Sequence, residues 1–219
     1  MNESNSRPGL PRVFVLGSSV TIHFGPYLAQ ELRGAFQYDR KQDSGGQRAQ
    51  DNLDVPQGAS AGDSGMVLSY LRLCRKSEPV PADILLLSCG LHDLKKSSKT
   101  GTHQVSLDAF ESNLREIVEE TRLAGLKLSW LRIGPVIDDI HNSRVQGFQR
   151  FSADVTAYNA AADRVMNDGG AHVIDFHTFC LSLIPDSLID HIHYDEAARQ
   201  AQARFIADEL KHRWLPWRI

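Results

Sequence analysis

The sequence has few cysteines and no long apolar run, and both absences limit what the protein can be. It contains three cysteines in 219 residues, an odd number without metal-ligand spacing. The cysteines therefore do not predict a disulfide framework, and we expect reduced thiols. The longest apolar runs, such as 84–87, are far too short to cross a bilayer, so no membrane span is expected.

The sequence also lacks an excess of one charge and a targeting segment. The formal net charge is -3, from 24 Lys and Arg residues against 27 Asp and Glu residues. This balance gives no general attraction for nucleic acid or anionic lipid, and we expect neither as a partner. The N-terminal residues MNESNSRPGLPR contain no apolar core, unlike a secretory signal, and predict a cytoplasmic protein.

No linker and no internal repeat divides the chain. A length of 219 residues favours a single core. We expect a flexible segment at 1–11, one domain at 12–213 and a tail at 214–219. The tail contains Trp214 and Trp217, and we expect it to pack on the domain or at a contact between copies, with a lid as the alternative. A homo-oligomer is compatible with the sequence.

Short apolar segments alternate with longer amphipathic ones. Buried parallel strands are predicted at 13–17, 82–90, 126–134 and 171–176, with 34–40 as a weaker fifth candidate. Helices are predicted at 106–124, 152–168 and 194–212, with Ser106 and Ser152 as N-caps. This alternation predicts an α/β fold, a doubly wound (flavodoxin-like) sandwich of about five parallel strands flanked by helices.

Ligands of such sheets bind outside the carboxyl ends of the strands. The segments found there are Gly17-Ser18-Ser19, 90–93, Gly134-Pro135 and the sequence DHIHYDE at 190–196. We expect the pocket walls to come from 91–105 and 135–150, and a mobile loop at 39–58 to line the entrance. Candidates for contact with a polar substrate, or for simple solvation, are Arg132, Asp138, Asp139 and Arg144.

Asp190 and His193 are three residues apart, just before the last predicted helix. A tight turn there brings both side chains to one side and directs His191 elsewhere. A carboxylate bound to one imidazole nitrogen fixes the tautomer and leaves the other nitrogen free to act as a base. The alternative is that Asp190 caps the helix and His193 is solvated.

Ser18 and Ser19 follow the first predicted strand. A serine hydroxyl is a weak nucleophile until a base removes its proton. At a helix N-terminus, neighbouring backbone N–H groups also stabilise an oxyanion, although a capping role is the simpler interpretation. The G-x-S-x-G elbow of α/β hydrolases does not fit, because Thr21 stands where its last glycine belongs.

Four blocks, in order, resemble the GDSL-type (SGNH) hydrolase superfamily. They are VFVLGSSVT at 13–21, GASAGDSG at 58–65, LLLSCGLHD at 85–93 and DHIH at 190–193. The resemblance spans residues 12 to about 210 and implies that Ser19 is a nucleophile, His193 its base and Asp190 the group that orients His193. It also implies an oxyanion hole formed by the backbone N–H groups of Ser19 and Gly62 and by the His92 side chain.

Two residues depart from the family pattern. Ser18 replaces an Asp that is neither nucleophile nor base in the family, so we expect altered hydrogen bonds at the turn rather than a lost reaction. His92 replaces an Asn that donates to the oxyanion. A neutral imidazole in the right tautomer still donates an N–H, and contact with the substrate is the alternative role.

The resemblance implies a serine ester hydrolase that acts through an acyl-enzyme on a small-molecule ester, deacetylation of a carbohydrate included, with no cofactor and no metal. Two alternatives stay open. The changes at Ser18 and His92 fit a weak or inactive protein of this fold that binds an acylated or carbohydrate ligand. The nine histidines suggest a metal-dependent hydrolase, although no His-x-x-x-His or similar ligand spacing is present.

Overall fold

The fold is built on one parallel β-sheet. We describe residues 9–215 of a computed structural model. Two terminal segments were expected at 1–11 and 214–219, and most of both, including Trp217, lies outside this range. Within the range, the main sheet has five strands in the order β2-β1-β3-β5-β7, all paired in parallel. The strands are β1 (Arg12–Gly17), β2 (Gln37–Arg40), β3 (Ile84–Ser88), β5 (Lys127–Leu131) and β7 (His172–Ile174). The predicted α/β sheet is therefore confirmed.

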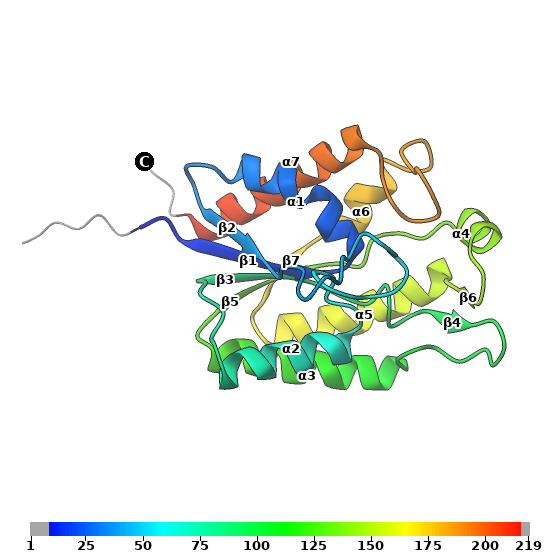
Figure 1. The fold of residues 1–219 in the computed structure, drawn as a ribbon, viewed down its shortest axis with the longest axis horizontal. Helices are drawn as coiled ribbons and strands as arrows, with labels where there is room; N and C mark the ends of the chain where they lie inside the picture. The colour runs from blue at the N-terminus through cyan, green and yellow to red at the C-terminus, as the bar shows by residue number, and fades with distance from the viewer. Residues whose placement is uncertain (1–8, 216–219) are drawn as a thin grey trace, which may run out of the picture.

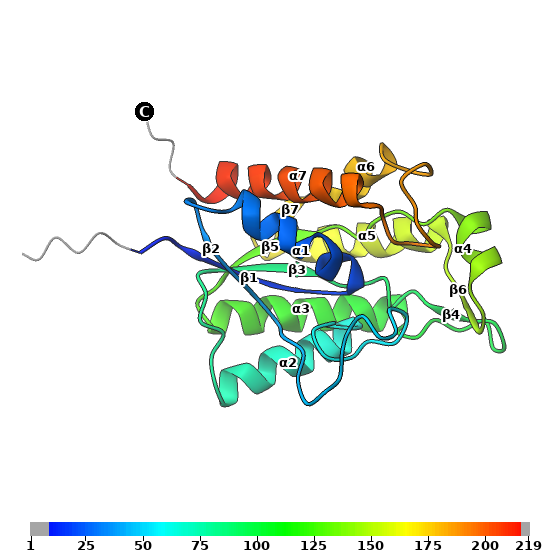
Figure 2. The same ribbon diagram turned by 45° about the horizontal axis from the view of Figure 1, so that its top comes forward.

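Helices cover both faces of the sheet (Figure 1). One face carries α1 (Ser19–Glu31), α6 (Phe176–Leu181) and α7 (Glu196–Trp214), and the other carries α2 (Ser64–Lys76), α3 (Leu107–Leu123) and α5 (Ser152–Asp168). The same layers are visible after the rotation in Figure 2. Because the chain adds β2 on one side of β1 and β3 on the other, the sheet is doubly wound. None of the helices within residues 9–215 has the length and apolar character needed to span a membrane.

Each central strand is buried on both sides. In β1, Val13 and Val15 join the core beneath α1 and α7, whereas Phe14 and Leu16 join the core beneath α2, α3 and α5. Successive strand residues point to opposite faces, so a strand covered by helices on both faces needs a continuous apolar run. This is why the uninterrupted apolar segments predict the strands correctly.

The two predicted N-caps have different outcomes. Ser106 caps α3, and its Oγ accepts the Ala109 N–H at 3.2 Å. The prediction for Ser152 is wrong, because Phe151 occupies the N-cap of α5 and Ser152 is the first helical residue. The Asp138 carboxylate, 14 residues away in sequence, accepts the Ser152 N–H at 2.7 Å. A tertiary contact thus binds a backbone N–H group at the start of the helix, where a local side chain was expected to act as the cap.

The region beyond the carboxyl ends of the strands contains elements that the sequence pattern does not predict. They are α4 (Asp138–Arg144) and the antiparallel pair of β4 (Lys96–Ser97) with β6 (Phe148–Gln149), at the right in Figure 1. The stretch 39–58 is mostly loop. Within it, the Asp43 carboxylate accepts the N–H groups of Ala49 and Ala59, which closes the loop upon itself.

Strands β1 and β3 end side by side, with Gly17 paired to Ser88. A Cβ atom at position 17 would overlap the Thr21 side chain and lie 3.1 Å from the Ser88 carbonyl oxygen, so this turn requires glycine. The Gly17 carbonyl also accepts the Ala61 N–H at 2.9 Å. Three of the segments quoted from the sequence therefore meet at one edge of the sheet.

Replacement of a buried strand residue should measure how much this core contributes. Leu85 is 0 % exposed in β3, and Leu85→Ala should lower the free energy of unfolding by about 2–5 kcal/mol, because it leaves a cavity. Leu73→Ala is the matched control, since Leu73 is 63 % exposed and should change stability by no more than about 0.5 kcal/mol. Urea unfolding measures both, and equal losses would contradict the assignment of the core.

Candidate active site

The fold brings a hydroxyl from the start of the chain against an imidazole from its end. Ser19 Oγ lies 2.7 Å from His193 Nε2, although 174 residues separate them in sequence. Ser19 is the first residue of α1, which follows directly from β1, and His193 lies just before α7. Both side chains are buried, with His193 only 1 % exposed. The predicted proximity of these two groups is therefore present.

Asp190 holds the other nitrogen of the same imidazole. Its Oδ2 lies 2.7 Å from His193 Nδ1, and its Oδ1 accepts the backbone N–H groups of Ile192 and His193, each at 2.8 Å. Asp190 is not the cap of the last helix, since Asp195 occupies that position in α7. The tight turn predicted from the three-residue spacing is thus formed, and it locks the carboxylate in place.

The charge state of Asp190 determines the direction of these hydrogen bonds. Burial alone would raise the pKa of the Asp190 carboxyl, but the hydrogen bonds from His193 and from two backbone N–H groups outweigh it and hold the pKa well below its usual range. An ionised carboxylate only accepts hydrogen bonds, so the proton of the neutral His193 ring is on Nδ1. Nε2 is then an acceptor for the Ser19 hydroxyl.

Gly62 and His92 lie at the same edge without touching Ser19. The bond from Ala61 to Gly17 holds the Gly62 segment against the turn that begins α1. His92 is 2 % exposed, and its Nδ1 is buried without a hydrogen-bond partner among the described residues. No hydrogen bond within residues 9–215 joins either residue to Ser19. Their part in the site therefore rests on their position.

His92 is a neutral imidazole. Burial is the main cause of a pKa well below the usual value, and the positive charges of Lys95 and Arg150 lower it further. A neutral ring carries one N–H donor and one acceptor. His92 can therefore replace the donor function of an Asn side chain without carrying a charge of its own.

Ser18 makes no side-chain hydrogen bond to the start of α1, although it occupies the N-cap. The Thr21 hydroxyl instead donates to the Ser18 carbonyl oxygen at 2.7 Å. Thr21 is the residue that rules out the G-x-S-x-G elbow in the sequence, and here it stabilises a different turn. The hydrogen bonds around this turn thus do not depend on the Ser18 hydroxyl.

Asp93, for which the sequence pattern predicts no role, connects two of the blocks. Its buried carboxylate accepts the Ser64 N–H at 2.9 Å and also the Ser64 hydroxyl, to which Asn113 Nδ2 donates at 2.9 Å. Burial raises the pKa of Asp93 to about 6 in spite of these hydrogen bonds. Ser64 is two residues after Gly62, so this contact fixes the Gly62 segment relative to His92.

His23, which was not predicted from the sequence, also lies at the site, and its ring centroid is 4.8 Å from that of His193. Burial, followed by the proximity of His193 and Arg199, lowers the pKa of His23 to about 4. His23 is four residues after Ser19 on α1, and residues four apart share a helix face. That spacing was the available signal for a second imidazole beside the nucleophile candidate.

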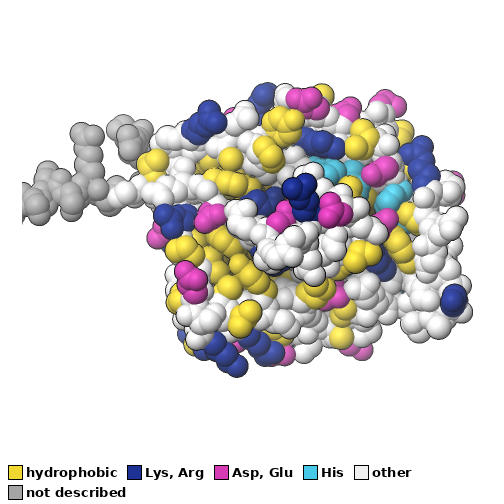
Figure 3. Space-filling model, viewed as in Figure 1, with side chains coloured by type: hydrophobic (Ala, Val, Ile, Leu, Met, Phe, Trp, Pro, Cys, Tyr) yellow, Lys and Arg dark blue, Asp and Glu magenta, His cyan; other side chains and the backbone are white. Residues whose placement is uncertain are grey.

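Further histidines surround the site. The rings of His191 and His193 are 6.0 Å apart, and those of His141 and His191 are 4.8 Å apart. His191 Nε2 lies 3.3 Å from Asp54 Oδ1, so His191 does point elsewhere than His193, as expected. Histidines reach the surface here beside charged side chains (Figure 3). Within residues 9–215, no three His, Cys, Asp or Glu side chains are arranged to hold a metal ion.

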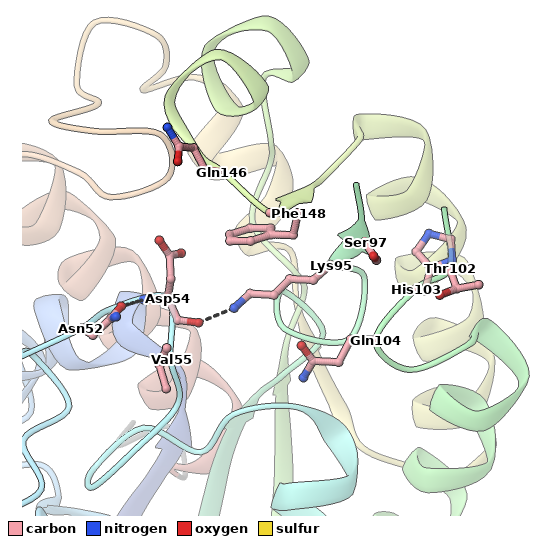
Figure 4. Close-up of a pocket in the computed structure, with 11 residues that line it drawn as sticks. Asn52, Asp54, Val55, Lys95, Ser97, Thr102, His103, Gln104, Gln146 and Phe148 are labelled. Carbon is pink, nitrogen blue, oxygen red and sulfur yellow. Dashed lines mark hydrogen bonds between the residues drawn. The ribbon is translucent and has the colours of Figure 1, made fainter. Parts of the chain in front are cut away.

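The chain also forms a pocket of about 560 Å³, whose lining does not include Ser19, Asp190 or His193 (Figure 4). It is lined by residues from 52–55, 95–104 and 146–148, so its walls come from the predicted segments. The Asp54 carboxylate connects it to His191. Of the four polar candidates, Arg144 reaches the site by donating to the Asp190 carbonyl at 2.9 Å, whereas Arg132 is paired with Asp163 and Asp175.

The residue that follows β3, Cys89, takes no part in these hydrogen bonds. Cys89 is 3 % exposed. Burial is the main cause of a pKa well above the usual thiol value, with the charge of Asp93 next. The side chain therefore remains a protonated thiol at neutral pH, as expected for an inert cysteine.

Solved structures of low sequence identity share the fold. A lipase/acylhydrolase from Enterococcus faecalis matches with a TM-score of 0.67 at 14 % identity, over 93 % of this chain and 97 % of that chain. The acetyl xylan esterase AlAXEase has a TM-score of 0.63 at 15 % identity, over 92 % and 98 % of the two chains. A GDSL-like lipase from Bacteroides thetaiotaomicron has a TM-score of 0.62 at 11 % identity, over 92 % and 86 %.

These likenesses lie in structure rather than in sequence. No protein-family model matches the chain, and no curated protein matches it significantly. The three structures cover nearly the whole of this chain. The chain therefore shares the fold of these lipases and esterases, as expected from the resemblance of the four sequence blocks.

His23 should make stability depend on pH. Its folded pKa of about 4 lies below the unfolded value of 6.5, so the unfolded chain gains a proton first and the free energy of unfolding falls as the pH falls from 7 to 5. In His23→Gln this fall should be smaller by about 1 kcal/mol, a figure reduced for the partial exposure of the ring. Urea unfolding at each pH measures it. The two proteins should behave alike between pH 7.5 and 8.5, and an equal fall below pH 7 would contradict the prediction.

Proposed function

We propose that the protein is a serine ester hydrolase that acts through an acyl-enzyme. The observation that carries this proposal is the pair of 2.7 Å contacts that join Ser19 Oγ to His193 and His193 to the Asp190 carboxylate. A hydroxyl, a base and a group that orients the base are the parts that nucleophilic acyl transfer requires. The named activities of the structural neighbours, acylhydrolase and esterase, support the same class of reaction.

Ser19 Oγ attacks the acyl carbonyl while His193 Nε2 takes its proton. The resulting imidazolium is stabilised by the ionised Asp190. His193 then gives the proton to the leaving alcohol, and the acyl group remains on Ser19. A water molecule, deprotonated by the same nitrogen, attacks the acyl-enzyme and releases the carboxylic acid. Every proton moves through side chains of this chain, and the scheme uses no cofactor.

The tetrahedral oxyanion forms next to the start of α1. We propose that the backbone N–H groups of Ser19 and Gly62 and the His92 side chain donate to it. Preorganised donors in a buried site stabilise a developing charge more strongly than the same donors in water. The neutral state of His92, set mainly by burial, supports a donor role rather than competition with His193 as a base.

The substrate is a small carboxylic ester that binds among polar side chains. The pocket is lined by polar side chains, among them Asn52, Gln104 and Gln146, which favours a polar alcohol or a short acyl group over a long alkyl chain. A neighbour named as an acetyl xylan esterase supports carbohydrate deacetylation as one such reaction.

Replacement of each of the two adjacent serines by alanine tests which hydroxyl is the nucleophile. Ser19→Ala should abolish hydrolysis of p-nitrophenyl acetate and labelling by a fluorophosphonate probe, with a Tm within about 3 °C of the parent because one hydrogen bond is lost. Ser18→Ala is the control and should keep both activities, because the Ser18 hydroxyl does not bond the helix start. Retained labelling of Ser19→Ala would refute the proposal.

Substitution of His92 tests the oxyanion hole. His92→Ala should lower kcat by about 10²–10³-fold, the loss seen when one oxyanion donor is removed. His92→Asn restores a neutral N–H donor and should recover a large part of this loss. Steady-state kinetics with p-nitrophenyl acetate measures both variants, and thermal melting shows whether they fold. Small and equal losses would indicate that His92 has no part in stabilising the oxyanion.

A further inference from the structure

Two buried cations take no part in the proposed proton transfers. Lys95 lines the pocket, and Arg150 packs against Phe148, another residue of the pocket wall. Lys95 is 9 % exposed and Arg150 is 3 % exposed. Both lie over the Phe148 ring, with Lys95 Nζ 4.7 Å and the Arg150 guanidinium carbon 4.9 Å from its centre. In Figure 4, the Lys95 side chain extends across the pocket beneath Phe148. Burial of a cation is unfavourable unless an anion balances it.

Neither cation forms an ion pair within residues 9–215. Arg150 Nε donates to the Leu91 carbonyl at 2.7 Å, and its Nη1 lies 2.8 Å from His141 Nε2. Lys95 Nζ donates to the backbone carbonyl of Asp54 rather than to its carboxylate. These partners are neutral groups, so both positive charges are left without a direct counter-charge.

The neighbouring carboxylates are bound to other groups. Asp54 Oδ1 contacts His191 at 3.3 Å. Asp63 accepts the Met66 N–H at 2.9 Å and the Gln104 side-chain amide at 2.7 Å. Burial, followed by the charge of Arg150, lowers the pKa of Lys95 to about 8, in spite of the opposing effect of both carboxylates. The Lys95 ammonium group thus has no direct anionic partner, and a negatively charged ligand would provide one.

The charges of the two cations also act on the proposed active site. Both are close enough to His92 to lower its pKa. The Asp54 side chain, which lines the pocket, contacts His191, whose ring is 6.0 Å from that of His193. Asp54 and His191 therefore connect the pocket to the base of the proposed reaction.

We propose that this pocket binds an anionic group of the substrate, held directly by Lys95 with Arg150 behind it. The inference rests on the proposed ester hydrolysis and narrows its substrate to an ester that bears a carboxylate or a phosphate. The cations would then serve specificity as well as structure. A purely structural role, in which Lys95 only holds the loop at Asp54, predicts no dependence on the charge of the substrate.

Three matched acetyl esters test the proposal: 3-acetoxybenzoate, 3-acetoxyphenyl phosphate and the neutral 3-acetoxybenzamide. The protein should hydrolyse at least one anionic ester with a kcat/KM about tenfold or more above that of the amide, which a single charge contact in a partly buried site supplies. The better of the two anions identifies the group. A kcat/KM ratio near one for both anions would overturn the inference while leaving ester hydrolysis intact.

Substitutions at adjacent lysines locate the effect. Lys95→Met should lower the ratio of anionic to neutral kcat/KM about tenfold, and Lys95→Arg should restore much of it, because the charge returns. Lys96→Met is the matched control. Lys96 lies over the Phe151 ring instead, and its removal should change neither the ratio nor the activity. Thermal melting checks that the Lys95 variants fold, and an unchanged ratio in folded Lys95→Met would overturn the inference.

A binding measurement separates this inference from the proposed reaction. Calorimetry with the product 3-hydroxybenzoate and with 3-hydroxyphenyl phosphate should show weaker binding to Lys95→Met than to the parent and the Lys96→Met control. If none of the esters is hydrolysed, the proposed function fails. Binding that depends on Lys95 would then still support the anion pocket, and binding independent of Lys95 would overturn it.

Discussion

The contact between Ser19 Oγ and His193 Nε2 depends on packing far from the two side chains. Ser19 begins α1, and His193 lies three residues before the start of α7. The two helices share one core on the same face of the sheet. Its residues include Phe24 and Leu28 from α1 and Ile206 and Leu210 from α7. Because the two helix starts lie at the carboxyl edge, the core that sets the spacing of the helices also sets the 2.7 Å contact. The geometry of the site thus depends on the same packing as the core.

The elements that the sequence predicts best are those whose structure is set by short spacings. A continuous apolar run suits a strand buried on both faces, and a separation of three residues brings Asp190 to His193 within one turn. Ser152 shows where this reasoning ends, because the partner of its N–H is Asp138, 14 residues away. The two-residue strands β4 and β6 contain too few side chains to show any period.

The site residues that were not predicted differ in how clearly the sequence pattern indicates them. His23 had a usable signal in its spacing of four from Ser19. The contact of Asp93 with Ser64 joins a loop to the start of α2, and the raised pKa of Asp93 comes mainly from burial, which no local pattern indicates. The sequence gives no indication that Arg150 is buried, since an arginine is usually exposed. Only the tertiary fold shows that its partners are a backbone carbonyl and the His141 ring.

The buried cations give a physical reason for histidine at position 92. In a site without nearby positive charge, an imidazole in place of an amide would compete for protons near neutral pH. Burial together with Lys95 and Arg150 lowers the pKa of His92 well below that range, so the ring stays neutral as an amide does. In the proposed mechanism, the same charges lower the energy of the oxyanion, because its negative charge develops within their field. The neutral state of His92 therefore depends first on its burial and then on the cations at positions 95 and 150.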